Sequence, residues 1–219
     1  MELKANAKAI SQRAMVRPPI AAAIILAGGK NSRMAGQDKA FLEIEGRPLI
    51  ELIFERLNNL VNEIIVVTNS PEKYHCYPVK LVSDEKPGLG PLMGLYCGLK
   101  ASSAKYNFVA ACDMPFLNAR LIKYMIDNSD AYDVLVPEID GQLHPLCGLY
   151  SRDCLAVIEE MLAQGRRDVR SIFPKLKVRY LAKEELDKFD QGLLSLVNIN
   201  TKDEYEKSLN HLPLLRGRL

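Results

Sequence analysis

A short apolar run that ends at two glycines constrains the fold of this chain more than any other feature. The run covers residues 20–27 and is closed by Gly28 and Gly29. A run without polar alternation is typical of a strand buried on both faces, and such strands occur in parallel sheets that carry helices on both sides. The chain is therefore expected to be an α/β protein.

The rest of the chain alternates between helix-like and strand-like segments. Apolar spacing predicts helices over 48–60, 91–101 and 119–128, and strands over 63–68, 79–82, 107–112 and 133–137. This order predicts a mostly parallel sheet wrapped by helices. After residue 137 the pattern is less regular, and we expect strands over 143–150, 178–181 and 196–199 and helices over 153–164, 167–173 and 202–210.

Length and charge limit the function classes. A chain of 219 residues suits one domain, which we place at 20–219, with residues 1–19 as a flexible, basic extension. An organellar transit peptide is the alternative for that extension. No apolar run reaches about 18 residues, so we expect no membrane span. The net charge of +2 gives no reason to expect a nucleic-acid partner.

The five cysteines indicate a reducing compartment. Their number is odd and no two are in C-x-x-C spacing, so neither a disulfide framework nor a structural zinc site is expected, and the cytoplasm fits best. Cys112 is the best placed as a nucleophile, but a buried structural thiol is the favoured interpretation.

The segment after the first predicted strand combines hydrogen-bond donors with cations. Gly28 and Gly29 bring backbone N–H groups close to a ligand, Ser32 adds a hydroxyl, and Arg33 and Lys39 add positive charge. This set suits an anion with several oxygens, such as a triphosphate, at the carboxyl end of a strand. The alternative is a plain strand-to-helix turn with solvated charges. The segment matches neither a Walker A loop nor G-x-G-x-x-G.

An acidic residue follows the strand predicted at 107–112. Asp113, held by Pro115, is placed to bind a hard cation, and Mg²⁺ takes one or two carboxylates together with substrate phosphates. The alternative is that Asp113 caps the helix that starts near Asn118. From the residues alone, the chain has a polyphosphate site with a metal ligand beside it.

Several motifs resemble one known family. L-A-G-G-x-x-x-R-M followed by D-K-A, then C-D-M-P, G-P-L-x-G and N-x-N-T, are similar to motifs of the molybdenum cofactor guanylyltransferases, the MobA family, over residues 20 to 209. Ala35 and Lys202 stand where the family often has Gly and Pro. The resemblance implies a Rossmann-like (glycosyltransferase-A-like), mostly parallel, three-layer α/β/α sandwich.

The resemblance also implies roles for individual residues. Arg33, Lys39 and Asp113 would be the catalytic group, with Arg33 and Lys39 on the triphosphate and the leaving pyrophosphate. Mg²⁺ would be held by Asp113 and Asn200. The nucleotide-binding residues would be Leu26, Ala27, Gly28, Gly29, Lys39, Asp84, Gly90 and Asp113. For Asp84 and Gly90, an ordinary turn is the alternative.

Three further residues would lie on the molybdopterin side: His144, Asn198 and Arg166. Each has a structural alternative. His144 could simply precede Pro145, and Arg166 could belong to a solvated helix start. Next to Asn198, Thr201 and Glu204 are at capping-box spacing whatever the function is.

The implied reaction is transfer of GMP from GTP to molybdopterin, with release of pyrophosphate and Mg²⁺ as the cofactor. The enzyme would be cytoplasmic, a monomer or weak oligomer, with cofactor-biosynthesis or apoenzyme partners. One alternative keeps the fold but uses CTP or another phosphorylated acceptor. The other is a non-catalytic carrier that hands molybdopterin to apoenzymes.

Overall fold

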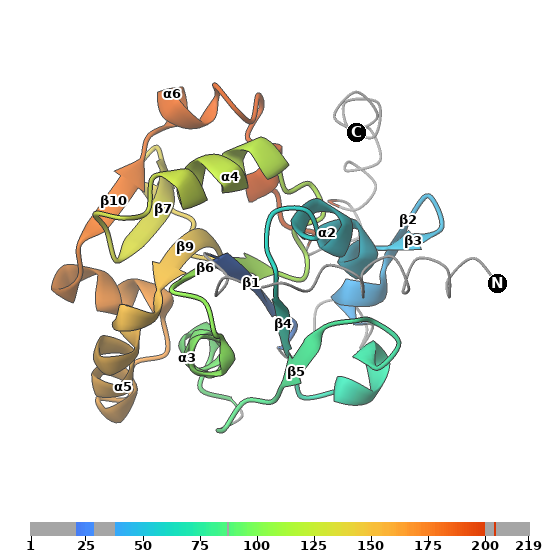
Figure 1. Ribbon diagram of the computed structural model, residues 1–219, viewed down its shortest axis with the longest axis horizontal. Helices are drawn as coiled ribbons and strands as arrows, with labels where there is room; N and C mark the ends of the chain where they lie inside the picture. The colour runs from blue at the N-terminus through green and yellow to red at the C-terminus, as the bar shows by residue number, and fades with distance from the viewer. Residues whose placement is uncertain (1–20, 29–37, 87, 200–203, 205–219) are drawn as a thin grey trace.

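The described residues form an eight-stranded sheet between two layers of helices. The computed structural model describes residues 21–28, 38–86, 88–199 and 204. The strand order is β10-β7-β9-β6-β1-β4-β5, with β8 paired to β7 (Figure 1). The strands are β1 (Ala21–Leu26), β4 (Ile64–Val67), β5 (Lys80–Val82), β6 (Tyr106–Ala111), β7 (Val134–Ile139), β8 (Gln142–Leu143), β9 (Cys147–Ser151) and β10 (Val178–Leu181).

The apolar run before Gly28 contains the strand β1, Ala21–Leu26, which is buried as predicted. All six residues of β1 are buried. The strand pairs in parallel with β4 on one side and β6 on the other, so that Leu26 lies opposite both Val67 and Ala111. Because parallel strands end at the same edge, we call the edge where β1, β4, β5 and β6 end the carboxyl edge.

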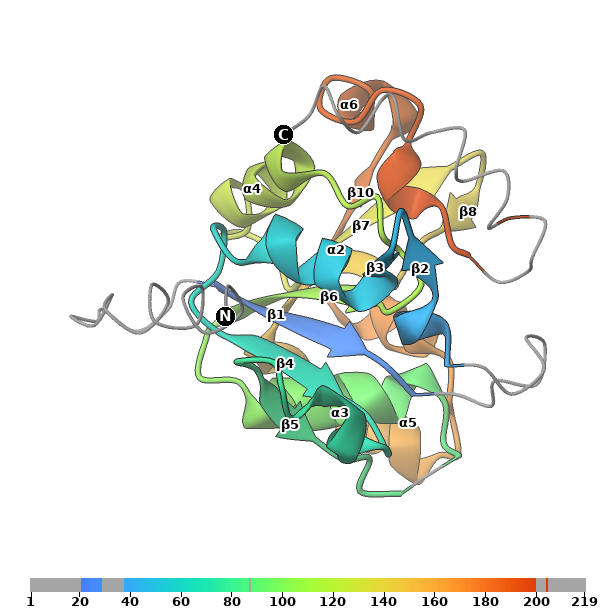
Figure 2. The ribbon, with the colours of Figure 1, turned by 90° about the vertical axis from the view of Figure 1, so that its right-hand side faces the viewer.

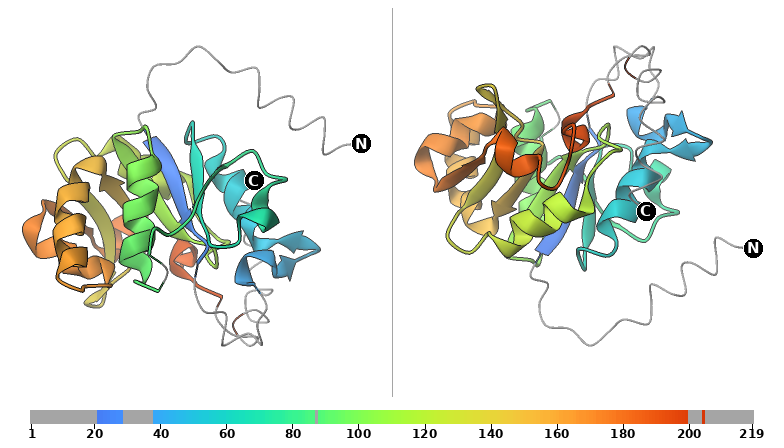
Figure 3. Two further views of the ribbon diagram at one scale, coloured as in Figure 1. Left: turned by 90° about the horizontal axis from the view of Figure 1, so that it is seen from below. Right: turned by 90° about the horizontal axis from the view of Figure 1, so that it is seen from above.

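Helices cover both faces of the sheet, which confirms the three-layer α/β/α sandwich. Helices α2 (Leu49–Leu57) and α4 (Ala119–Asp127) lie on one face, and α3 (Pro91–Ala101) and α5 (Leu155–Ala163) lie on the other (Figures 1 and 3). Each face has its own apolar core. None of these helices, nor any other among the described residues, is long and apolar enough to cross a membrane.

The strand predicted over 143–150 is wrong as a single strand. The structure divides it into β8, which pairs with β7, and β9, which runs antiparallel between β6 and β7. Pro145 lies at the break, where its missing N–H cannot donate to a ladder. Between β7 and β8 the chain turns at Asp140 and Gly141, whose φ angles are 50° and 77°.

The strand predicted over 196–199 is also wrong. Leu194–Leu196 form a 3₁₀ turn, η5, which follows a left-handed residue, Leu193, with φ of 51°. The chain then runs extended to Ile199 without a ladder partner among the described residues. Its residue Ile199 is buried against Ile44, Leu49 and Phe116, which come from three different elements, and no ladder orders the segment among the described residues. Residue spacing alone does not distinguish this kind of burial from burial in a sheet.

Two other short elements differ from the prediction. The helix expected over 167–173 is a 3₁₀ helix, η4 (Val169–Lys175), which begins after Asp168 because that carboxylate accepts from the N–H of Arg170. The small hairpin of β2 (Glu43–Ile44) and β3 (Arg47–Pro48) was not predicted. Three further short elements are the 3₁₀ helices η2 (Pro71–Tyr74) and η3 (Arg152–Cys154) and the helix α6 (Lys183–Leu186). The extension 1–19 and the helix predicted over 202–210 lie outside the described residues, apart from Glu204.

Candidate active site

Gly28, after β1, and Asp113, after β6, both lie at the carboxyl edge. Leu26 lies opposite Ala111, and the N–H of Cys112 donates to the carbonyl of Leu26 at 3.2 Å. Gly28 and Asp113 each lie two residues beyond this pair, so both follow strand ends at the carboxyl edge. Figure 2 shows β1 and β6 as neighbours in the sheet. The structure therefore brings together the two features that the sequence singled out. Gly29 and Arg33 lie outside the described residues.

Asp113 forms an ion pair and keeps one oxygen available. The ammonium of Lys39 lies 3.1 Å from Asp113 Oδ2, and both side chains are largely buried. Asp113 Oδ1 is buried and has no hydrogen-bond partner among the described residues. A buried carboxylate oxygen without a partner is costly. A cation bound at this oxygen would remove that cost.

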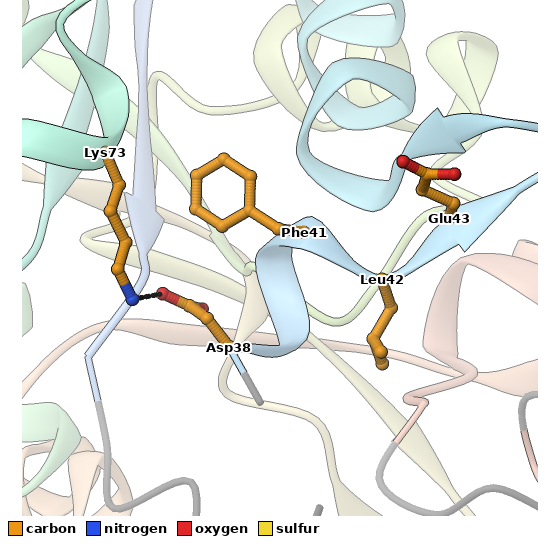
Figure 4. Close-up of a pocket in the computed structure, with 5 residues that line it drawn as sticks. All are labelled: Asp38, Phe41, Leu42, Glu43 and Lys73. Carbon is orange, nitrogen blue, oxygen red and sulfur yellow. Dashed lines mark hydrogen bonds and ion pairs between the residues drawn. The ribbon is translucent and has the colours of Figure 1, made fainter. Parts of the chain in front are cut away.

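Lys39 is positioned by a short turn that a neighbouring loop supports. The turn is η1 (Lys39–Phe41), capped by Asp38, whose carboxylate accepts from the N–H of Ala40. Lys73, in η2, forms an ion pair of 3.0 Å with the other oxygen of Asp38. The rings of Phe41 and Tyr74 pack with centroids 5.1 Å apart. Figure 4 shows the hollow beside this turn, which is lined by Asp38, Phe41, Leu42, Glu43 and Lys73.

Asp84 is held beside the same edge by a residue that the sequence analysis did not select. Asn69, just after β4, donates through its amide to Asp84 Oδ2 at 3.3 Å and accepts the N–H of Asp84 at 3.2 Å. Burial raises the pKa of the Asp84 carboxyl, and the hydrogen bond from Asn69 opposes this shift. The other oxygen, Oδ1, is buried without a partner among the described residues. In the sequence, the signal at Asn69 was that the predicted strand 63–68 ends at Asn69-Ser70-Pro71.

Glycines leave room around the Asp84 carboxylate. A Cβ on Gly28 would lie 3.9 Å from Asp84 Oδ2, and a Cβ on Gly94 would lie 3.7 Å from Oδ1. The φ of Gly28 is not left-handed, so its contribution is space and not an unusual turn. Gly90 differs, because its φ is +74° and a Cβ there would approach the Arg167 carbonyl to 3.0 Å. Gly28, Asp84 and the start of α3 thus border one region of the edge.

The three residues expected on the molybdopterin side, Asn198, His144 and Arg166, lie at three different places in the structure. Ile199 N–H donates to the Asp113 carbonyl at 2.9 Å, which brings its half-buried neighbour Asn198 to the site. His144 is half-buried where β9 enters the sheet at the carboxyl edge, and burial lowers its pKa. Arg166 is exposed, and it is the adjacent Arg167 whose carbonyl accepts the N–H of Leu92 at the start of α3. Asn200 lies outside the described residues.

Comparison with known proteins assigns the family. The family model described as a MobA-like NTP transferase domain matches residues 23–180. The chain belongs to this family. MobA-like relatives align over most of the chain, and they include the molybdenum cofactor guanylyltransferase of Desulfosudis oleivorans. That protein is 39% identical over 186 residues, covering 84% of this chain and 92% of its own. A probable molybdenum cofactor guanylyltransferase of Natranaerobius thermophilus is 35% identical, over 87% of this chain and 95% of its own.

Solved structures agree with this assignment. The molybdopterin-guanine dinucleotide biosynthesis protein A of Archaeoglobus fulgidus superposes with a TM-score of 0.77 at 26% identity, covering 88% of this chain and 98% of its own. A 4-diphosphocytidyl-2C-methyl-D-erythritol synthase of Anaerococcus prevotii, at 16% identity over 89% of this chain and 96% of its own, has a TM-score of 0.67 and shows the fold alone. The α/β architecture predicted from sequence is therefore that of the nucleotidyltransferase fold.

Cys112 is half-buried and lies directly before Asp113. Burial, together with the charge of the adjacent Asp113, raises the pKa of the Cys112 thiol to about 12. A thiol whose pKa is raised in this way is a weaker nucleophile and metal ligand at neutral pH than an ordinary cysteine. The structural interpretation of Cys112 is favoured.

Proposed function

We propose that this protein transfers GMP from GTP to molybdopterin, forming molybdopterin guanine dinucleotide and releasing pyrophosphate. The observation that carries the proposal is the pairing of Lys39 with Asp113 at the carboxyl edge, with one Asp113 oxygen that has no hydrogen-bond partner among the described residues. The names of relatives that align over more than four-fifths of the chain support the choice of GTP and molybdopterin.

The residues present fit a divalent metal. Asp113 offers a buried carboxylate oxygen without a partner among the described residues, which is the ligand type that Mg²⁺ prefers. The described residues contain no group of three His, Cys, Asp or Glu that could hold a metal alone, so substrate phosphates would complete the coordination. Asp113 would hold the ion and Asn200 is the proposed second ligand. When bound, Mg²⁺ would orient the triphosphate and neutralise its charge.

The protein would act mainly by positioning and charge neutralisation. The backbone from Leu26 through Gly29 would lie along the phosphates. Lys39 would leave Asp113 for the triphosphate, and Arg33 would share the charge of the leaving pyrophosphate. The terminal phosphate of molybdopterin would attack the α-phosphorus in line, forming one P–O bond while the bond to the β-phosphate breaks. A phosphate monoester has a second pKa of about 6, so it attacks without a general base.

Asp84 and Gly90 would bind the nucleoside, while His144, Asn198 and Arg166 would face molybdopterin. A carboxylate accepts from the N1–H and N2–H₂ donors of guanine, and Asp84 Oδ1 has no competing partner among the described residues. CTP lacks this pair of donors in the same arrangement. We place the reaction in the cytoplasm and expect a monomer or weak oligomer.

Two assays test the proposed function. In a thermal-shift panel with Mg²⁺, GTP should raise the unfolding midpoint more than CTP, ATP or UTP, because only a ligand of the native state stabilises it. Purified protein given GTP, Mg²⁺ and molybdopterin should release pyrophosphate and form the dinucleotide. A larger shift with CTP would support the cytidylyl alternative. Nucleotide binding without pyrophosphate release would support the carrier.

Asp84→Asn is expected to stabilise the free protein and weaken GTP binding. Burial raises the pKa of the Asp84 carboxyl above its ordinary value of 3.8, so ionising it disfavours the folded state. The wild-type protein should therefore lose stability relative to Asp84→Asn as the pH rises from about 4 toward 7. GTP affinity should fall about tenfold, because a charged hydrogen-bond acceptor is lost.

Thermal unfolding of both proteins across this pH range checks the first expectation, and calorimetric GTP titration checks the second. Asp127→Asn is the control, since Asp127 is exposed on α4 and forms an i,i+4 pair with Lys123. Stability curves that run parallel for wild type and Asp84→Asn would contradict the assigned role of burial. An unchanged GTP affinity would remove Asp84 from the nucleoside site.

A further inference from the structure

A small third core lies beneath the candidate active site, apart from the cores on the two sheet faces. It consists of Ile44, Leu49, Phe116, Leu194 and Ile199, all buried. These residues come from the β2–β3 hairpin, the start of α2, the loop after β6 and the segment 189–199, which approaches the hairpin in Figure 2. The cluster therefore joins the parts of the chain that carry Lys39, Asp113 and Asn198.

A buried hydrogen-bond network attaches the segment 189–199 to the loop after β6. Ser195 Oγ accepts the N–H of Asn118 at 2.8 Å, and Ser195 N–H donates to Asp190 Oδ2 at 2.8 Å. The Asn118 amide donates to the Phe189 carbonyl at 2.9 Å. Ser195 is 1% exposed and Asp190 is fully buried. The segment thus meets the loop from its beginning to Ile199, whose N–H reaches the Asp113 carbonyl.

The same hydrogen-bond network is connected to the start of helix α4. Asn118 also caps α4, because its side chain accepts the N–H of Arg120 at 2.9 Å. Burying a carboxylate such as Asp190 is costly unless hydrogen bonds hold it. Here the buried carboxyl group accepts the N–H of Ser195 and so orders a segment that forms no ladder among the described residues. The segment ends at Ile199, whose N–H donates to the Asp113 carbonyl.

We propose that Ser195, held by Asp190, is a positioning residue that sets Asp113 and Asn198 at a fixed separation for transfer. The inference rests on the proposed function, because it assigns Asp113 to the metal and Asn198 to the acceptor. Ser195 touches neither substrate. It acts through the loop 113–118, whose displacement by a fraction of an ångström would misalign the attacking and leaving oxygens.

The first experiment compares Ser195→Ala with Ser151→Ala. Ser151 is also 1% exposed and also accepts a backbone N–H, that of Asp153 at 3.1 Å, but it lies opposite Tyr106 at the far edge of the sheet. For Ser195→Ala we expect kcat for GMP transfer to fall roughly tenfold while the KM for GTP changes less than about twofold. Ser151→Ala should lower the unfolding midpoint without this loss of kcat. Ser195→Thr, which keeps the hydroxyl, should recover most of the kcat.

The second experiment does not depend on activity. Hydrogen exchange should be faster at the amides of Asn118 and Ile199 in Ser195→Ala than in wild type or Ser151→Ala. Calorimetric titration with Mn²⁺ in the presence of GTP should show a severalfold weaker affinity for Ser195→Ala. If wild-type protein transfers no GMP, the proposed function fails while these readouts still test the network. Equal kcat losses in the two alanine variants, or unchanged exchange at Ile199, would overturn the inference.

Discussion

Asp113→Asn is expected to reduce kcat/KM for GMP transfer by about 10³-fold, which corresponds to about 4 kcal/mol of transition-state stabilisation. The asparagine has the same shape but no charge, and Asp113 Oδ1 is the buried oxygen that has no partner among the described residues. The loss should therefore appear mainly as weaker metal binding. Pyrophosphate release measured against Mg²⁺ concentration checks this.

The control for this variant is Asp127→Asn. Asp127 also pairs with a lysine, Lys123, at 2.8 Å, but this pair is exposed along α4, which begins near the site and leads away from it. Activity of Asp127→Asn should stay close to that of wild type. If Asp113→Asn retained wild-type activity and metal dependence, Asp113 would not be the metal ligand.

Lys39→Met is expected to lower kcat/KM by about 10²-fold, comparable with the loss of one preorganised donor to a developing charge. It should also destabilise the free protein by about 1–3 kcal/mol, because the largely buried Asp113 loses its counterion. Lys39→Arg should recover little activity, since a guanidinium does not replace a compact ammonium at one position.

The double variant Lys39→Met with Asp113→Asn separates the two roles of the pair. Removing both charges should restore part of the lost stability without restoring activity, because no charge of the pair is then left buried without its partner. The same single and double substitutions at Lys123 and Asp127 provide the comparison, because an exposed ion pair has a small coupling free energy. If the double variant were as unstable as the sum of the singles, the ion pair would not explain the stability of this edge.

Local signals predicted the elements that build the central sheet. The helix over 91–101 was predicted at its observed bounds, because Pro91 and Gly90 mark its start and apolar spacing continues to Ala101. The apolar run before Gly28 and the strand before Asp113 were likewise found from residue type alone. Once both are parallel neighbours, the meeting of Gly28 and Asp113 follows from topology.

What was missed depends on contacts between distant segments. Asn69 is recognisable only when Asp84 is known to lie beside it, fifteen positions along the chain. Ser195, whose N–H is bound by Asp190, accepts the N–H of Asn118 from 77 positions away. The segment 196–199 has the apolar residues of a strand, but Ile199 is buried against the β2–β3 hairpin, the start of α2 and the loop after β6 and not in the sheet. The spacing of apolar residues in a sequence indicates which side chains are buried and with what period, but it does not identify the segment they pack against.

The central claim is that a nucleoside triphosphate and its metal meet Asp113 beside the glycine turn. A crystal structure with GTP and Mn²⁺, recorded at a wavelength where manganese scatters anomalously, tests it directly. We predict an anomalous peak within about 2.3 Å of an Asp113 carboxylate oxygen, shared with phosphate oxygens that lie along Gly28, and Lys39 turned toward the triphosphate. A nucleotide bound away from Gly28, or a metal that does not touch Asp113, would contradict the account.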